Sequence, residues 1–318
     1  MNYYLAPMEG LTTYQFRIAY HHYFGGIDKY FTPFISSKKM NHRERSEILP
    51  KHNEGLHVIP QILTNRSDEF LQIADKIKDY GYSTVNLNLG CPSGTVVARK
   101  RGAGFLSIPD SLDRFLYELY EKCPLNISIK TRIGIESLDE WKNLLKIYQK
   151  YPVEELIIHP RLQKELYHFT PHIEAFQTAL HSSTMPLCYN GDLTSVTTFN
   201  TLVTKFPQIN RVMIGRGIIK NPALIFAMRD LKEKHLYQNF YQKERFRAFH
   251  DTLFDSYATT MSGETPTLFK MKDLWTYLSQ SFIDSSPYLK KIRKATSFAQ
   301  YKIAIDTLFR ECELMPTP

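Results

Sequence analysis

Val85-Asn86-Leu87-Asn88-Leu89-Gly90-Cys91-Pro92 begins as a strand and ends as a loop. Apolar and polar residues alternate in it with a period of two, which is typical of a β-strand. Gly90 and Pro92 then end the strand on either side of a single cysteine. We therefore expect Cys91 at the C-terminal end of a strand, where its thiol can face a pocket. The alternative is a small buried hydrophobic residue, since free cysteine is among the most buried residue types.

Eight short apolar or β-branched runs recur along the chain. They are Tyr3–Pro7, Tyr30–Phe34, Val58–Leu63, Thr84–Leu89, Ile127–Thr131, Leu156–His159, Pro186–Asn190 and Arg211–Gly215. Most starts lie roughly 25 to 32 residues apart, the length of one strand, one helix and two short connections. One longer gap of about 43 residues follows Thr84. This spacing predicts an α/β fold, a TIM (β/α)8 barrel.

Two of the intervening segments show how the predicted helices would start. Ser67-Asp68-Glu69 precedes an amphipathic run from Phe70 to Ile77, and Ser137-Leu138-Asp139-Glu140 precedes another that begins at Trp141. Serine and acidic residues at these positions are typical of a helix N-terminus. We expect both segments to be capped helices that pack outside the sheet.

Polar residues follow nearly every predicted strand. They are Pro7-Met8-Glu9-Gly10, Gln61, Asn88 with Cys91, Lys130 with Arg132, His159 with Arg161, Asn190-Gly191-Asp192 and Gly215-Arg216-Gly217. The C-terminal ends of barrel strands form one rim, where the functional groups of this fold lie. Buried polar groups without partners cost about 1–3 kcal/mol each, so we expect this rim to bind a polar ligand.

The last two strand ends predict a phosphate site. Loops after the seventh and eighth strands of a barrel commonly bind phosphate, and here they contain Gly191, Gly215 and Arg216. Glycine lets main-chain N–H groups approach the phosphate, and arginine adds charge. Lys130 is interpreted either as a satisfied charge on the rim or as the cation beside an electron-rich ring.

Beyond Tyr241 glycine becomes rare and apolar residues follow helical spacing. We expect a barrel over 1–240 and an all-helical bundle over 241–318, divided at Gly263, Pro266 and Pro287. Lys290-Lys291-x-Arg293-Lys294 is a concentrated basic patch in this second part. It is either a solvated helix face or a surface for a polyanion.

Composition narrows the class of protein. The 318 residues are 43% hydrophobic and carry a net charge of +8, which suits a globular protein with a polyanionic partner. Apolar runs are far shorter than the roughly 20 residues that span a bilayer, so we expect no membrane segment and a cytoplasmic location. Four widely spaced cysteines predict neither a zinc site nor a disulfide framework.

These motifs together resemble the dihydrouridine synthase family of flavin-dependent RNA-modifying enzymes. The resemblance rests on six stretches in family order. They are Ala6-Pro7-Met8-Glu9-Gly10, Asn88-Leu89-Gly90-Cys91-Pro92-Ser93, Ile129-Lys130-Thr131-Arg132-Ile133-Gly134, Ile158-His159-Pro160-Arg161, Asn190-Gly191-Asp192 and Met213-Ile214-Gly215-Arg216-Gly217. It implies that 1–240 is an FMN-binding catalytic barrel and 241–318 a helical RNA-binding domain. It also implies an oxidoreductase that reduces the 5,6 double bond of uridine in RNA, with tRNA as the expected substrate, to dihydrouridine.

The resemblance also implies residue roles. Cys91 would donate the proton, while FMN would supply the hydride from N5 and NADPH would be the reductant. The residues expected around FMN are Pro7, Met8, Gln61, Lys130, His159, Asn190, Gly191, Asp192, Gly215 and Arg216, and those near the substrate are Asn88, Arg132 and Arg161. No metal is expected, and we expect a monomer.

Two departures from the family pattern concern the substrate side. A lysine common three or four residues beyond the cysteine is replaced by Gly94 and Thr95, and Leu162-Gln163-Lys164-Glu165 stands where threonine and glutamine are frequent. Three alternatives remain at this point: rRNA as the substrate, a barrel flavoenzyme acting on a small molecule and similar to dihydroorotate dehydrogenase, and an RNA-binding flavoprotein whose redox chemistry is dispensable.

Overall fold

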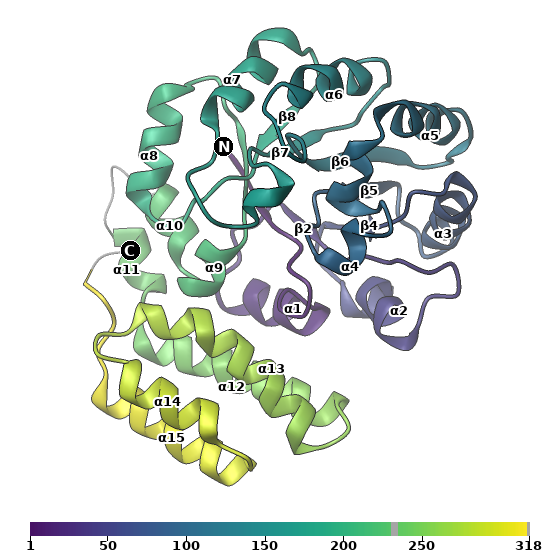
Figure 1. The fold of residues 1–318 in the computed structure, drawn as a ribbon. Coiled ribbons are helices and arrows are strands. Elements are labelled where there is room, and N and C mark those ends of the chain that lie inside the picture. The colour runs from purple at the N-terminus through teal and green to yellow at the C-terminus, as the bar shows by residue number, and fades with distance from the viewer. Residues whose placement is uncertain (230–234, 317–318) are drawn as a thin grey trace. The chain divides into compact units, whose positions relative to one another are not determined.

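A parallel β-sheet closes nearly completely into a barrel in the computed structural model, which describes residues 1–229 and 235–316. Its strands are β1 (Asn2–Leu5), β2 (Lys29–Phe31), β3 (Val58–Ile59), β4 (Gln61–Ile62), β5 (Thr84–Leu89), β6 (Asn126–Arg132), β7 (Leu156–His159), β8 (Leu187–Tyr189) and β9 (Arg211–Ile214). They are ordered β3-β2-β1-β9-β8-β7-β6-β5-β4. All eight predicted strands are thus present, and the (β/α)8 barrel is confirmed. Figure 1 shows helices arranged around the strands.

The third predicted strand closes the ring although it is split at Pro60. β3 pairs with β2, and β4 pairs with β5, so the two halves of one strand occupy the two ends of the sheet. Proline has no N–H to donate, which explains an interruption at this point. Its carbonyl still accepts from the N–H of Asn86 at 2.8 Å, so the barrel stays connected across the break.

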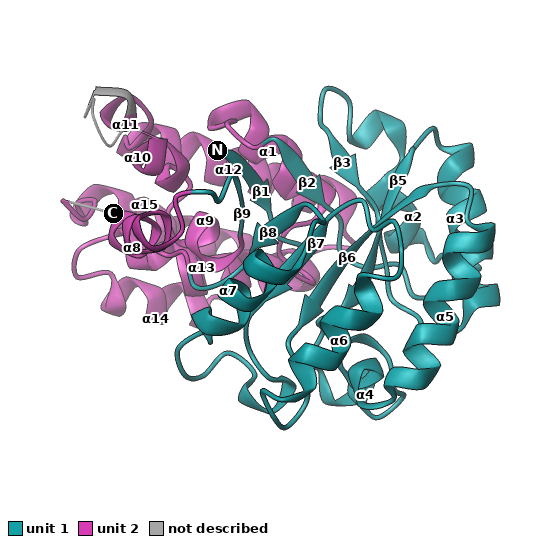
Figure 2. Ribbon diagram, turned by 90° about the horizontal axis from the view of Figure 1, so that it is seen from above, with its two compact units in different colours: residues 1–7, 28–192, 208–213 teal, residues 8–27, 193–207, 214–318 magenta. Residues whose placement is uncertain are grey.

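The chain divides into two compact units, coloured separately in Figure 2. Unit 1 comprises Met1–Pro7, Asp28–Asp192 and Gln208–Met213, and therefore holds nearly all of the sheet. Unit 2 comprises Met8–Ile27, Leu193–Pro207 and Ile214–Pro318. The predicted domain boundary at 240/241 falls between two helices of unit 2, and the roles assigned to the two domains stay predictions.

Unit 1 surrounds its strands with helices. They are α2 (His42–Ile48), α3 (Ser67–Asp79), α4 (Gly94–Val97), α5 (Pro109–Lys122), α6 (Glu140–Tyr148) and α7 (Ile173–Ser182), with 3-10 turns at Pro50–His52, Gly102–Ser107 and Gln163–Glu165. Helix α3 buries Phe70, Ile73, Ala74 and Ile77, the apolar face that the sequence indicates. Inside the sheet, a buried cluster joins Tyr4, Ala6, Phe31, Ile59, Ile157, Cys188 and Met213. This apolar interior fills the barrel below its rim.

Both predicted helices are present, but their predicted side-chain caps are wrong. The side chains of Ser67 and Asp139 make no capping hydrogen bond. Helix α6 begins at Glu140, whose carboxylate accepts from the N–H groups of Ile135, Glu136 and Ser137, each at 2.8 Å. A carboxylate in the first turn of the helix thus accepts from the N–H groups that precede the helix. An acidic group is also favourable at this end, since the helix dipole is positive there.

Unit 2 is helical, as predicted for 241–318. Its elements are α1 (Tyr14–Tyr23), α8 (Val196–Lys205), α9 (Arg216–Lys220), α10 (Leu224–Arg229), α11 (His235–Phe240), α12 (Lys243–Thr260), α13 (Glu264–Leu278), α14 (Ser286–Lys294) and α15 (Phe298–Glu311). Helix α1 packs on α12, where the rings of Phe16 and Phe249 meet edge to face at 5.6 Å. Phe269 on α13 is an exception to this apolar packing, since it is 64% exposed. None of the helices in the described residues is long and apolar enough to cross a membrane.

Candidate active site

Strand register brings predicted site residues of unit 1 side by side. Asn88 on β5 lies opposite Lys130 on β6, and Arg132 lies opposite His159 on β7. Because parallel strands end at the same edge of the sheet, these side chains belong to one rim at the C-terminal end of the barrel. The structure therefore brings together the predicted residues of β4 to β8.

A chain of buried polar side chains runs from this rim into the barrel. Asn88 Nδ2 donates to Gln61 Oε1 at 2.7 Å, and Gln61 Nε2 donates to Asn86 Oδ1 at 2.7 Å. Asn86 Nδ2 then donates to Ser128 Oγ at 2.9 Å, and Ser128 Oγ donates to the carbonyl of Val85 at 3.2 Å. Each of these four hydrogen bonds pairs a donor with an acceptor, and such a network fixes one arrangement of its side chains.

The loop that carries Cys91 is held by the end of that chain. Asn88 Oδ1 accepts from the N–H groups of Gly90 at 3.0 Å and of Cys91 at 2.9 Å. Gly102, with φ +55°, lies against the other side, where an added Cβ would stand 2.9 Å from the Cys91 carbonyl. Cys91 is half-buried. Cys91 thus lies just beyond the C-terminal end of β5, as predicted, and its main chain is fixed there.

Lys130 is an unpaired cation in this rim. Its ammonium forms no hydrogen bond or ion pair with another described residue, and the side chain is half-buried. Burial lowers the pKa of Lys130 to about 8, with a further contribution from the charge of Arg132, and the Cys91 side chain acts in the opposite direction. A buried ammonium without a partner is costly, so this position suits an anionic or electron-rich ligand.

Arg161 is completely buried and uses its donors within unit 1. Nη1 donates to Asp192 Oδ1 at 3.1 Å and to His159 Nε2 at 3.0 Å, and Nη2 donates to Asp192 Oδ2. Nε donates to the carbonyl of His168 at 3.2 Å, and Nη2 to that of Phe169 at 2.6 Å. A guanidinium has five N–H groups. The substrate contact predicted for Arg161 stays a prediction, and it would require one of these five bonds to be exchanged.

The Arg161 contact also assigns the His159 tautomer. Arginine can only donate, so Nε2 of His159 accepts, and we place the proton of the neutral ring on Nδ1.

Arg132 joins the cysteine loop to the loop after β7. Nε donates to the carbonyl of Gly90 at 3.1 Å, Nη1 to that of Leu162 at 2.8 Å and Nη2 to that of Leu166 at 2.6 Å. Burial lowers the pKa of Arg132, an effect to which the neighbouring Arg161 adds. The guanidinium also lies 5.4 Å from the ring centre of Tyr167.

Glu165 accounts for one departure from the family pattern. Its Oε1 is 2.7 Å from His172 Nε2, and its Oε2 accepts from the N–H of Leu162 at 2.8 Å. Burial raises the pKa of Glu165, but the bonds from His172 and Leu162 outweigh it and hold that pKa below its usual value. The carboxylate therefore fixes the turn Gln163–Glu165 from within.

The predicted phosphate residues follow β8 and β9. Asn190 Nδ2 donates to the carbonyl of Met213 at 2.8 Å, and an added Cβ at Gly191 would overlap the ring of Tyr189, so only glycine fits there. Gly215 directly follows β9 and precedes Arg216, the first residue of α9 in unit 2. Pro7 belongs to unit 1 and Met8 to unit 2. The roles of these residues stay predictions.

Four residues of the site were not predicted as site residues from the sequence. Asn86 and Ser128 lie on strands, and their alternation with apolar residues could have shown that they face the barrel interior. Glu165 and Tyr167 lie in a loop, where no periodic signal exists.

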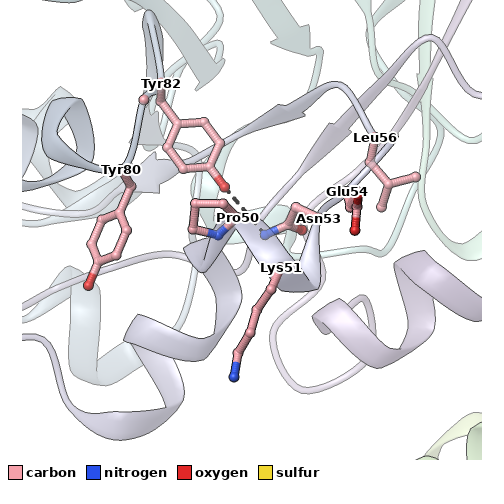
Figure 3. Close-up of a pocket in the computed structure, with 8 residues that line it drawn as sticks. Pro50, Lys51, Asn53, Glu54, Leu56, Tyr80 and Tyr82 are labelled. Atoms are coloured by element: carbon pink, nitrogen blue, oxygen red, sulfur yellow. Dashed lines mark hydrogen bonds between the residues drawn. The ribbon is translucent and has the colours of Figure 1, made fainter.

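A separate pocket lies at the opposite end of the barrel. It is lined by Pro50, Lys51, Asn53, Glu54, Leu56, Tyr80, Gly81 and Tyr82, from the segments that lead into β3 and β5 (Figure 3). Asn53 Nδ2 donates to the Tyr82 hydroxyl at 3.3 Å across it. In a (β/α)8 barrel the N-terminal ends of the strands contribute to stability, whereas the C-terminal ends carry the functional groups. This pocket is therefore distinct from the rim around Cys91. Among the residues described, no cluster of three or more histidine, cysteine or acidic side chains could hold a metal.

Fold and rim together define a (β/α)8 barrel enzyme with a thiol, an unpaired lysine and a buried polar network at the C-terminal ends of its strands. Residues 4–313 match the family model described as dihydrouridine synthase (Dus), and the chain belongs to this family.

Named relatives agree with the family. The chain is 29% identical over 264 residues to a protein of Staphylococcus epidermidis named "Probable tRNA-dihydrouridine synthase", with 80% of this chain and 78% of the relative covered. It is 27% identical over 237 residues to "tRNA-dihydrouridine synthase B" of Pasteurella multocida, with 73% and 70% covered. The solved structure of N-acetylneuraminate lyase from Mycoplasma synoviae superposes with a TM-score of 0.49 at 9% identity, covering 86% of this chain and 97% of that one.

Proposed function

We propose that this enzyme reduces the 5,6 double bond of a uridine in tRNA, using FMN and NADPH, with Cys91 as the proton donor. Two relatives carry tRNA-dihydrouridine synthase in their names, which supports tRNA as the substrate. The observation that carries the proposal is the position of Cys91: its main chain is fixed by Asn88, and its side chain interacts electrostatically with both Lys130 and Arg132.

The rim residues fit FMN. Lys130 is an unpaired, half-buried ammonium, which is the charge that an electron-rich ring system needs beside it. When bound, reduced FMN would supply a hydride to one carbon of the uracil double bond. We assign the phosphate contact to Arg216, on the sequence evidence of a basic residue that follows glycine after the last strand.

Cys91 completes the reduction. Hydride addition to one carbon of the double bond leaves negative charge on the uracil, and the proton of the Cys91 thiol passes to the other carbon. The electron pair of the S–H bond stays on sulfur, and the thiolate recovers a proton from water. Lys130 and Arg132 stabilise this transient thiolate, which makes proton transfer less costly.

Direct measurement of the product tests the proposal. Purified enzyme is supplied with FMN, NADPH and an unmodified tRNA transcript, and dihydrouridine is measured by mass spectrometry of the digested RNA. We expect dihydrouridine at a defined position, and Arg216→Ala should lose FMN more readily because it removes a charge-assisted contact. Product on an rRNA transcript and none on tRNA would overturn the substrate assignment. Absence of dihydrouridine in both RNAs would overturn the activity.

A further inference from the structure

Leu166, Tyr167, His168 and Phe169 form an exposed segment after β7, called here the 166–169 segment. Phe169 is 77% exposed, the largest fraction for any large hydrophobic side chain among the described residues, and Tyr167 is 54% exposed. Leu166 is 41% exposed. Adjacent exposed aromatic and aliphatic side chains mark a binding surface more often than isolated ones do.

The main chain of the 166–169 segment is fixed although its side chains are exposed. The carbonyl of Leu166 accepts from Arg132, and the carbonyls of His168 and Phe169 accept from Arg161. Both arginines are completely buried. Two buried cations therefore hold the main chain of this segment in one conformation, so that it loses little main-chain freedom on binding.

That conformation is strained. Leu166 has φ +52° and Phe169 has φ +63°, a region that residues other than glycine adopt at a cost. Glycine at either position would remove the strain and the exposed side chain together. The chain instead carries two large apolar side chains there, which indicates that they are used.

The segment belongs to the same rim as Cys91. Arg132 holds both the carbonyl of Leu166 and that of Gly90, next to the cysteine. Gln163, just before the segment, donates to the carbonyl of Pro92 at 3.4 Å. Tyr167 lies over the Arg132 guanidinium on one side, and its ring centre is 6.2 Å from that of His159.

We propose that the 166–169 segment is a stacking surface for an unpaired RNA base next to the target uridine. The proposal rests on the proposed function, because a uridine that enters the barrel must leave its stack and exposes the base beside it. Aromatic side chains accept any base on their faces, and a cation beneath Tyr167 strengthens the contact with an electron-rich ring. Phe169 and Tyr167 would hold the neighbouring base while Cys91 meets the target.

Binding of an unmodified tRNA transcript at one fixed salt concentration tests this role. We expect Phe169→Ala to raise the dissociation constant about 5- to 150-fold, the range that corresponds to base–aromatic stacking measured by alanine substitution. Phe169→Trp should bind within about twofold of the wild type. Tyr117→Ala, which removes an aromatic side chain that is 59% exposed on α5, is the matched control and should also bind as the wild type does.

Two further measurements separate stacking from a structural effect. The salt dependence of binding should keep its slope in Phe169→Ala, since the substitution removes no positive charge that could bind a phosphate. Phe169→Gly should unfold at a higher temperature than the wild type, because strain is relieved, while binding tRNA as poorly as Phe169→Ala. A structural role would move stability and binding in the same direction.

The stacking surface can be disproved while the proposed function stands. If the wild type forms dihydrouridine, and if Phe169→Ala binds tRNA as tightly as the wild type, the stacking surface is disproved and the proposed activity stands. If Phe169→Leu binds like the wild type, the contact is merely apolar, as a protein partner would use, and stacking is likewise disproved. A wild type that forms no dihydrouridine would instead count against the proposed function.

Discussion

Asn88 Oδ1 accepts a hydrogen bond from the N–H of Cys91 at 2.9 Å, so an amide at the end of one strand fixes the main chain of the thiol three residues later. The same oxygen accepts from Gly90, and the Asn88 amide nitrogen donates to Gln61. Asn88 thus joins the polar network inside the barrel to the reactive loop on its rim. Under the proposed function, a change at Asn88 would act on the chemistry through Cys91.

Asn88→Ala should lower the free energy of unfolding by about 1–3 kcal/mol, because two N–H groups and the buried Gln61 oxygen lose their partner. The amide of Cys91 should also exchange with deuterium faster than in the wild type. Urea denaturation and hydrogen-exchange mass spectrometry measure the two effects. Asn65→Ala, which removes a half-buried side chain whose amide donates to the carbonyl of Arg99 at 3.1 Å, is the control. Unchanged exchange at Cys91 would show that other contacts hold the loop.

Arg161→Lys should destabilise the protein although it keeps the charge. Lysine has three donors on one nitrogen and cannot replace the bonds to Asp192, His159 and two carbonyls. We expect a loss of about 2–4 kcal/mol in the free energy of unfolding, measured by urea denaturation. Arg66→Lys is the matched control, since Arg66 also makes a two-bond pair, with Asp68, but at an exposed site. That control should not change stability measurably, and equal losses in both variants would disprove the role of burial.

The sequence predicted the barrel because each strand carries its own local signal. Alternation at Asn86 to Leu89, and glycine or proline at the strand ends, depend only on neighbours a few residues apart. The same regularity placed Cys91, Lys130 and His159 at strand ends, where the structure has them. Connection lengths then sufficed for the fold class.

Contacts between distant loops were not predictable in this way. The bonds from Arg132 to Leu166 and from Arg161 to Phe169 join a buried strand end to a loop with no periodic pattern. The sequence does not distinguish an arginine that binds a substrate from an arginine that binds a main-chain carbonyl. Its five donors, counted in the structure, decide how much of it is left for a ligand.

The affinity for FMN should fall as pH rises from 7 to 9. Burial lowers the pKa of Lys130 from 10.5 to about 8 in the protein without ligand, so the folded chain loses this proton first. Below pH 8 this lysine is charged in both the folded and the unfolded chain, and its burial then lowers the free energy of unfolding by the full amount. This loss becomes smaller between pH 8 and 10.5, where the folded chain gives up the proton first. At pH 9 about nine tenths of the sites lack the positive charge that attracts the flavin, which weakens binding by up to about tenfold.

Fluorescence titration of the flavin-free protein with FMN at several pH values measures this dependence. Lys130→Met should bind FMN weakly and with the same affinity at pH 7 and pH 9, and it should be more stable than the flavin-free wild type at pH 7. Lys146→Met, at an exposed position of α6, should behave as the wild type does. A Lys130→Met variant that keeps the pH dependence would assign it to another group.

Charge reversal on α14 tests the basic patch. Lys290, Lys291, Arg293 and Lys294 are exposed, and none has an ion pair with another described residue. Reversal of Lys290 and Lys291 to glutamate should weaken tRNA binding and lower the salt slope by about 1 for each phosphate that the variant no longer binds. Reversal of Lys142 and Lys146, which are exposed on α6, makes the same change in net charge and is the control. Equal losses of affinity in the two double variants would show that only net charge matters.

Cys91→Ser separates proton donation from flavin reduction. Reduction of bound FMN by NADPH needs no proton from Cys91, so its rate should stay close to that of the wild type. Reoxidation of the reduced enzyme by tRNA should slow by about 10²- to 10⁴-fold, the usual contribution of a general acid, because a serine hydroxyl is a far weaker acid than a thiol. Stopped-flow absorbance of the flavin under anaerobic conditions measures both half-reactions.

Binding measurements complete this test, because a packed cysteine and a proton donor differ in what the substitution changes. The affinity of Cys91→Ser for tRNA should stay within a few fold of the wild type, since serine occupies the same fixed loop and Asn88 still bonds to its N–H. A loss confined to reoxidation then assigns the proton to the thiol. If reoxidation by tRNA proceeds at the wild-type rate, Cys91 is not the acid, and its half-buried side chain serves only the packing of the loop against Gly102.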